Sequence, residues 1–254
     1  MKLGERKFYR RKEDEDLLIK IKSILNRRPS YGYRRITYML NKERLEKDLP
    51  ILNKKRIYRI MKMNSLIVEK YSGVKRRENR TGKIMTLKSN TRWCSDCFEI
   101  RCFNGEKVYV TFALDTCDRE ILAFKAKGKP IIIRDIQELM YNSVKYRFGD
   151  YKTDRPIQWL TDRGAIYRSE ETQSFGRRLG LRPCMTMPYS PQSNGMAEAF
   201  VGTFKRDYVY NFDCKDARTV LKNIKSWFED YNSNAPHSAL KMMSPRDFIK
   251  RNQV

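Results

Sequence analysis

Histidine is almost absent from this sequence, and cysteine is scarce. There is one histidine, His237, and there are six cysteines among 254 residues. Only Cys94 and Cys97 are separated by two residues, as in many zinc sites, and they lie in a stretch with strand character. Residues three apart on a strand point to opposite faces and chelate one ion poorly. We therefore expect reduced cysteines that serve as small apolar residues.

Long apolar runs are also missing. No run approaches the roughly 18 residues that a membrane-spanning helix needs. Residues 1–12 lack the apolar stretch of a secretory signal peptide. We expect a soluble intracellular protein with no membrane partner.

Acidic residues are few relative to basic ones. Lys and Arg number 54 against 30 Asp and Glu, a formal net charge of +24. Such a charge repels itself in a compact fold unless a polyanion lies against it, and nucleic acid is the first candidate. Residues 1–90 hold 27 of the basic and only 10 of the acidic residues. This asymmetry predicts a basic module at residues 1–69, a basic linker at 70–90 and a larger domain at 91–254.

Apolar spacing predicts three short helices in the basic module. The first spans 14–25 and ends at Arg28–Pro29, the second spans 33–40, and the third follows Asn53, a favourable N-cap residue. Three such helices suggest a helix-turn-helix that places its last helix in the major groove of DNA. The alternative is a solvated basic face on an ordinary helical bundle. The candidate DNA-binding residues on the third helix are Lys54, Lys55, Arg56, Arg59 and Lys62.

The pattern changes after residue 90, where strands and helices mix. Strand patterns occupy 92–100, 107–115, 119–126, 157–160 and 184–187, and helical patterns occupy 132–144, 169–180, the stretch after 190 and 217–231. The predicted order is β-β-β-α-β-α-β-α-α. This order indicates an α/β fold, a mixed sheet with flanking helices.

Three carboxylates stand out in this second part. Asp96 lies mid-strand, Asp162 at the end of another strand, and Glu198 inside a helix. A carboxylate within an apolar strand is costly to bury without a counter-ion. Three that converge would suit Mg²⁺ with oxygen ligands, and two such ions can drive an in-line phosphoryl displacement. Spacing alone leaves open that the three have no common role.

Several motifs resemble a known family. WCSD, WLTDRGAIYRS, SPQSNGMAEAFVGTFKRDYV and YNSNAPHSALKMMSP are similar to the integrase-core signatures of insertion-sequence transposases encoded in two overlapping reading frames. YGYRRITYML and NKKRIYRIMKMNSL resemble the helix-turn-helix segment upstream of that core. The resemblance covers nearly the whole chain, and its sharpest element is the 35 residues between Asp162 and Glu198.

The resemblance implies a specific chemistry. It implies an RNase-H-like fold, a catalytic and metal-binding triad of Asp96, Asp162 and Glu198, and strand transfer of element ends with Mg²⁺, for which Mn²⁺ substitutes. Lys205 matches the basic residue seven positions after the glutamate, two helical turns along the same face. We assign it to DNA.

The resemblance also implies partners. These are double-stranded DNA at element ends and target, further copies of the chain in a homo-oligomer, and an upstream-frame product or a frameshift fusion with it. A cytoplasmic, nucleoid-associated location follows. Two positions depart from the family pattern: Ala235 replaces an arginine before Pro236–His237, and Lys241 replaces a glycine.

Other classes fit less well. The zinc module of retroviral integrases needs two histidines, and a tyrosine recombinase needs an Arg-His-Arg cluster that the segment around His237 does not offer. A nuclease acting on RNA–DNA hybrids would not need the basic helical module. The remaining alternative is a catalytically inactive, element-derived DNA-binding protein or repressor.

Overall fold

The computed structural model describes residues 13–67, 86–186 and 195–252. Their contacts divide the chain into two compact units. One contains the described residues before position 78 together with Pro236–Met243, and the other contains the rest. Of the predicted linker 70–90, residues 70–85 lie outside the described residues, as does the proline-containing stretch 187–194.

The helical unit contains the three predicted helices. They are α1 (Asp14–Arg27), α2 (Tyr33–Leu45) and α3 (Lys54–Met63). The side chain of Asn53 accepts a hydrogen bond from the backbone of Lys55, which confirms the predicted N-cap of α3. The unit has its own apolar core, in which Ile21, Ile36 and Ile57 from the three helices are fully buried.

The second unit is built on a five-stranded sheet. The strands are β1 (Arg92–Arg101), β2 (Lys107–Asp115), β3 (Ile121–Lys127), β4 (Ile157–Thr161) and β5 (Leu181–Met185). Their order is β3-β2-β1-β4-β5. The first three strands form an antiparallel meander, and β4 and β5 run parallel to β1. The sheet is therefore mixed, as predicted.

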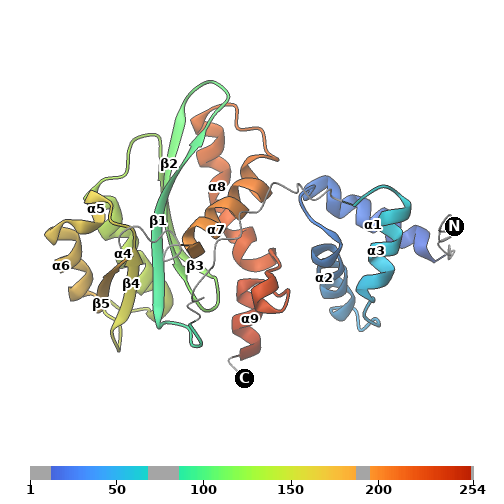
Figure 1. Ribbon diagram of the computed structural model, residues 1–254, viewed down its shortest axis with the longest axis horizontal. Helices are drawn as coiled ribbons and strands as arrows, with labels where there is room; N and C mark the ends of the chain where they lie inside the picture. Colours follow the sequence, from blue (N-terminus) through green and yellow to red (C-terminus); the bar gives the residue numbers. More distant parts are fainter. Residues whose placement is uncertain (1–12, 68–85, 187–194, 253–254) are drawn as a thin grey trace, which may run out of the picture. The chain divides into compact units, whose positions relative to one another are not determined.

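Helices cover both faces of this sheet, with α4, α5 and α6 on one side and α7 and α8 on the other (Figure 1). The remaining elements are α4 (Ile133–Phe148), α5 (Ala165–Arg168), α6 (Glu170–Arg178), α7 (Gly195–Phe204), the π-helix η2 (Lys205–Val209), α8 (Ala217–Asn234), the 3-10 helix η3 (Ser238–Leu240) and α9 (Pro245–Asn252). No helix within the described ranges is long and apolar enough to cross a membrane.

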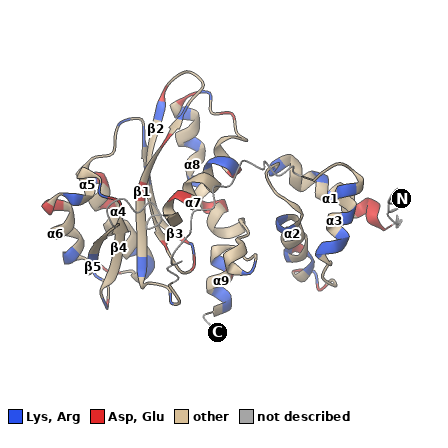
Figure 2. Cartoon of the chain, in the orientation of Figure 1, with Lys and Arg blue, Asp and Glu red and all other residues tan. Residues whose placement is uncertain are grey.

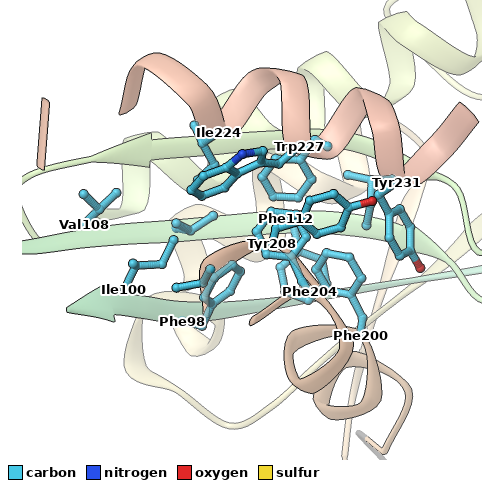
Figure 3. Packing of buried hydrophobic residues seen from close by; sticks show 14 of the residues in the cluster. Phe98, Ile100, Val108, Phe112, Phe200, Phe204, Tyr208, Ile224, Trp227 and Tyr231 are labelled. Carbon is cyan, nitrogen blue, oxygen red and sulfur yellow. The ribbon is translucent and has the colours of Figure 1, made fainter. Parts of the chain in front are cut away.

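Aromatic residues fill the core between the sheet and α7 and α8. Phe98 and Phe112 from the sheet meet Phe200 and Phe204 of α7, and Trp227 of α8 packs on the same cluster (Figure 3). Phe204 is fully buried. Because each such side chain removes a large apolar area from water, this core fixes α7 firmly against the sheet.

Some details of the prediction were wrong. The apolar spacing over 217–231 predicts that Leu221 enters the core, but its side chain is exposed on α8. The helix predicted to end at residue 40 continues to Leu45, and β5 begins at Leu181 rather than at 184. Neither α5 nor α9 was predicted, because a single turn and an eight-residue helix carry little periodicity. In contrast, Cys94 and Cys97 do face the cores on opposite sides of the sheet.

Candidate active site

Asp96 lies in the middle of β1, on the sheet face that α7 covers. Its neighbours two residues away, Cys94 and Phe98, belong to the core under that helix. One carboxylate oxygen of Asp96 accepts a 2.7 Å hydrogen bond from the backbone N–H of Cys97. The backbone carbonyl of Asp96 accepts another from Thr111 on β2. Asp96 is half-buried, so the hydrogen bond from Cys97 orients its carboxylate while part of the residue stays accessible to solvent.

Asp162 follows directly after the last residue of β4. Its Oδ1 atom accepts a 3.0 Å hydrogen bond from the backbone N–H of Gly164. A Cβ atom on Gly164 would lie only 3.0 Å from the same oxygen. Glycine thus allows the turn to close tightly around the carboxylate.

Strand pairing brings the segments that carry Asp96 and Asp162 side by side. β1 and β4 are parallel, and their last paired residues are Cys94 and Leu160. Asp96 and Asp162 each follow two residues after this pair, and neighbouring strands lie about 4.8 Å apart. The pKa of Cys97, whose thiol is largely buried, is raised first by burial and further by the negative charges of Asp96 and Asp162. Both carboxylates therefore lie close to one point of the sheet.

Glu198 lies on α7 and is exposed to solvent. Among the described residues, which include all three carboxylates, no three Asp, Glu, His or Cys side chains are close enough together to hold a metal ion. The structure thus does not bring the three carboxylates within reach of one ion. Glu198 does lie on a helix that covers the correct face, since Ala197 and Phe200 beside it enter the same core as Cys94.

Lys205 lies where α7 gives way to the π-helix η2. Its ammonium nitrogen is 5.6 Å from the centre of the Phe98 ring, a cation–π contact. Phe98 is two residues from Asp96 on the same face of β1. Lys205 is therefore held by an aromatic ring beside the part of β1 that carries Asp96.

The donor chemistry of Asp96 and Asp162 fits a hard divalent cation. Both supply carboxylate oxygens, the ligands that Mg²⁺ prefers, and each has one oxygen oriented by a backbone N–H. Two half-buried carboxylates on adjacent strands also repel each other unless a cation lies near them.

The basic residues of α3 fall into two groups. Lys54, Lys55 and Lys62 are exposed. Arg56 and Arg59, which were also predicted to contact DNA, are instead partly buried. Both bind the carboxylate of Asp14 on α1, at 2.8 and 2.6 Å. Burial would raise the pKa of Asp14, but the hydrogen bonds from the two arginines outweigh it and hold this pKa below its usual value. The two arginines thus join α3 to α1.

A second group of carboxylates was not predicted from the sequence. Asp115, Asp118 and Glu120 are buried at the turn between β2 and β3, and Arg147 of α4 contacts all three at 3.6, 3.0 and 3.0 Å. Burial, then the charge of Asp118, raises the pKa of Asp115 to about 6. Because an arginine already neutralises these acids, we assign them to the architecture. Nothing in the spacing of DTCDRE marks its acids as buried.

The chain matches models of known families in three segments. Residues 12–72 match an HTH-like domain, and residues 87–191 and 179–245 match two models of an integrase core domain. The transposase InsD of insertion element IS2A/D/F/H/I/K from Escherichia coli is 42% identical over 243 residues, which cover 95% of this chain and 81% of the relative. The chain belongs to the family of IS2-type insertion-element transposases.

Further relatives agree with this membership. The InsD transposase of insertion element IS2-9 from Escherichia coli strain K12 is also 42% identical, over 95% of this chain and 79% of its own length. A solved structure of a simian T-cell lymphotropic virus intasome in complex with PP2A regulatory subunit B56 gamma matches 91% of this chain and 73% of its own, with a TM-score of 0.52 and 15% identity. This last likeness concerns the fold alone, an integrase-type, RNase-H-like sheet with flanking helices. The chain is thus a transposase with an integrase core and an HTH-like helical unit.

Proposed function

We propose that this transposase cleaves the ends of its insertion element and joins them to target DNA, in a reaction that depends on divalent metal. The observation that supports the proposal is that Asp96 and Asp162 each lie two residues beyond the pair Cys94–Leu160 of the parallel strands β1 and β4. In the proposal Glu198 completes the triad. Its helix covers the same face, and Lys205, two turns further along that helix, already lies over Phe98.

The residues have separate roles in this proposal. Asp96, Asp162 and Glu198 hold Mg²⁺, with Mn²⁺ as a substitute, and two such ions would activate the attacking oxygen and stabilise the leaving oxygen. Lys205 is too far along its helix to share those ligands, about 10 Å from Glu198 at ~1.5 Å per residue. As a cation it neutralises a phosphate of the element end instead.

The helical unit supplies affinity for double-stranded DNA. We assign the DNA contacts to the exposed lysines of α3, which are Lys54, Lys55 and Lys62. Arg56 and Arg59 hold α3 in position, since both of their guanidinium groups bind Asp14.

We further propose that residues 1–69 and 91–254 work as separate DNA-binding and catalytic parts joined by 70–90. Assembly of several copies on DNA, together with an upstream-frame product or a fusion with it, and a cytoplasmic, nucleoid-associated location complete the proposal.

The test is cleavage and strand transfer by the full-length chain on duplex DNA that carries the ends of its own element. Asp162→Asn and Glu198→Gln should abolish Mg²⁺-dependent cleavage while DNA affinity stays nearly unchanged, because an amide keeps the shape and removes the charge that holds the cation. Lys205→Ala should bind cation normally and join ends poorly.

Asp154→Asn is the matched control, since Asp154 is an exposed carboxylate shortly before β4. It should cleave as the wild type does. Equal loss of cleavage and DNA binding in Asp162→Asn would assign that residue to the fold. A wild type that binds end DNA but never cleaves it would favour the inactive repressor.

A further inference from the structure

Beneath the two strand carboxylates lies a buried tyrosine hydroxyl. Tyr167 is on α5, and its hydroxyl is 3.0 Å from the hydroxyl of Ser95 and 3.4 Å from the sulfur of Cys97. Ser95 and Cys97 are the residues on either side of Asp96 in β1. Because side chains alternate along a strand, both lie on the face opposite Asp96. The hydroxyl of Tyr167 thus contacts the residues of β1 immediately before and after Asp96.

The same tyrosine is attached to the turn that carries Asp162. The backbone N–H of Tyr167 donates to the carbonyl of Gly164, at 3.0 Å, and the N–H of Gly164 donates to Asp162. On the other side, the N–H of Cys97 donates to Asp96. A continuous set of contacts therefore leads from one carboxylate to the other through Tyr167.

This arrangement is rigid for physical reasons. Ser95 is fully buried and Tyr167 nearly so. Burial raises the pKa of the phenol well above its usual value, so the hydroxyl keeps its proton. A buried hydroxyl that moves away from such partners loses its hydrogen bonds, which costs free energy. These contacts fix the distance between β1 and α5.

We propose that Tyr167 is a positioning residue that sets the distance and orientation between Asp96 and Asp162, and so the affinity of this carboxylate pair for divalent cation. The proposal rests on the function proposed above for the two carboxylates. Outer residues that orient metal ligands typically change metal affinity or activity by about 10- to 100-fold when they are removed.

The experiment titrates Mn²⁺ into the full-length chain and follows free Mn²⁺ by electron paramagnetic resonance, without DNA turnover. Tyr167→Phe removes only the hydroxyl and leaves the ring in the core. We expect Mn²⁺ affinity to fall about 10-fold or more, and strand transfer to recover when Mg²⁺ or Mn²⁺ is raised. Ser95→Ala, which removes one partner without touching the ring, should shift the affinity in the same direction by less.

Tyr146→Phe is the matched control, because it also removes one tyrosine hydroxyl, which here bonds Glu120 at 2.7 Å in the second carboxylate group. Its thermal midpoint should fall while its Mn²⁺ affinity stays at the wild-type value. Mn²⁺ binding by Tyr167→Phe equal to that of the wild type would overturn the inference.

An Asp162→Asn arm separates the two proposals. If this variant loses Mn²⁺ binding and Tyr167→Phe does not, the positioning role is wrong and the proposed function stands. If Asp162→Asn binds Mn²⁺ as the wild type does, the carboxylates are not the cation site and both fail.

Discussion

At the scale of single residues, the basic side chains of α3 differ in what they contact. Lys54 and Lys55 begin the helix in the open, at an end whose dipole disfavours cations. Positive charge placed there costs stability unless an anion lies against it. Arg56 and Arg59, one helical turn apart, have an anion already in Asp14. The two arginines therefore serve the fold, and the exposed lysines are the ones that we propose to contact DNA.

This division gives a prediction. Replacement of Lys54, Lys55 and Lys62 by alanine should weaken duplex DNA binding and reduce the log–log salt slope by about 0.9 for each lost phosphate contact. Stability should stay within about 0.5 kcal/mol of the wild type, since these side chains are exposed. Salt-dependent binding of the full-length chain is the measurement, with Lys22→Ala, an exposed lysine of α1, as control.

Asp14→Asn should do the reverse and destabilise the helical unit by about 1–3 kcal/mol, because it strips two half-buried arginines of their anion. All three tryptophans, Trp93, Trp159 and Trp227, lie in the other unit. Circular dichroism should then show an early transition that tryptophan fluorescence does not. Since the pKa of Asp14 is lowered on folding, its contribution is present above pH about 4 and is lost as the pH falls below that. Loss of DNA affinity with unchanged stability would contradict the assignment.

At the scale of elements, the end of α6 depends on Gly180. Its φ is +83°, and a Cβ there would lie 2.2 Å from the hydroxyl oxygen of Thr153. The helix must close here so that the chain can enter β5 beside β4, where Leu181 pairs with Ile157. Two independent obstacles, backbone strain and a steric clash, therefore oppose any side chain at this position.

Gly180→Ala should destabilise the sheet unit by about 2–4 kcal/mol, the sum of left-handed strain and overpacking. Gly149 ends α4 with φ +72° and nothing within 4 Å of the position of a Cβ. Gly149→Ala should thus cost only the strain, about 1–2 kcal/mol. Denaturant unfolding followed by tryptophan fluorescence compares the two, and equal costs would show that the contact with Thr153 relaxes freely.

At the scale of the whole sheet unit, a buried polar network joins elements distant in sequence. Arg147 of α4 binds the acids of the β2–β3 turn, and Arg246 of α9 contacts Glu120 of that turn and Glu229 of α8. Arginine is thus present inside the fold, and Figure 2 marks where Lys and Arg lie along the helices and strands. The indole N–H of Trp93 also donates to Asp115.

The charge of Asp118 contributes to the raised pKa of Asp115, so Asp118→Asn should lower that pKa from about 6 towards 3.8. A raised folded pKa means that ionisation of Asp115 costs stability as pH rises from about 4 to about 6. This cost should shrink in the variant, by ~1.4 kcal/mol for each unit by which the pKa falls. Carboxyl ¹³C shifts of Asp115 measure it, with Asp150→Asn as an exposed control. An unchanged pKa would leave burial as the sole cause.

Local sequence alone determined most elements and their inward faces. Apolar periods of two and of 3.6 residues placed the strands and long helices, Asn53 and Ser169 marked helix starts that their side chains do cap, and charge separated the basic module from the rest. Lys241 illustrates the limit of this reading. Its φ of 54° is a left-handed backbone conformation, which glycine adopts without steric cost and which nothing in the local pattern of the sequence predicts.

Tertiary structure decided which side chains meet. The spacing of Asp96, Asp162 and Glu198 identified the candidates. Only the pairing of β1 with β4 brings the segments of the first two side by side, and only the packing of α7 leaves Glu198 exposed. Asp14 binds arginines more than 40 residues away, and Tyr167 grips a strand about 70 residues away. Such contacts join residues far apart in the chain, so they arise from how sheet and helices pack, which no local pattern records.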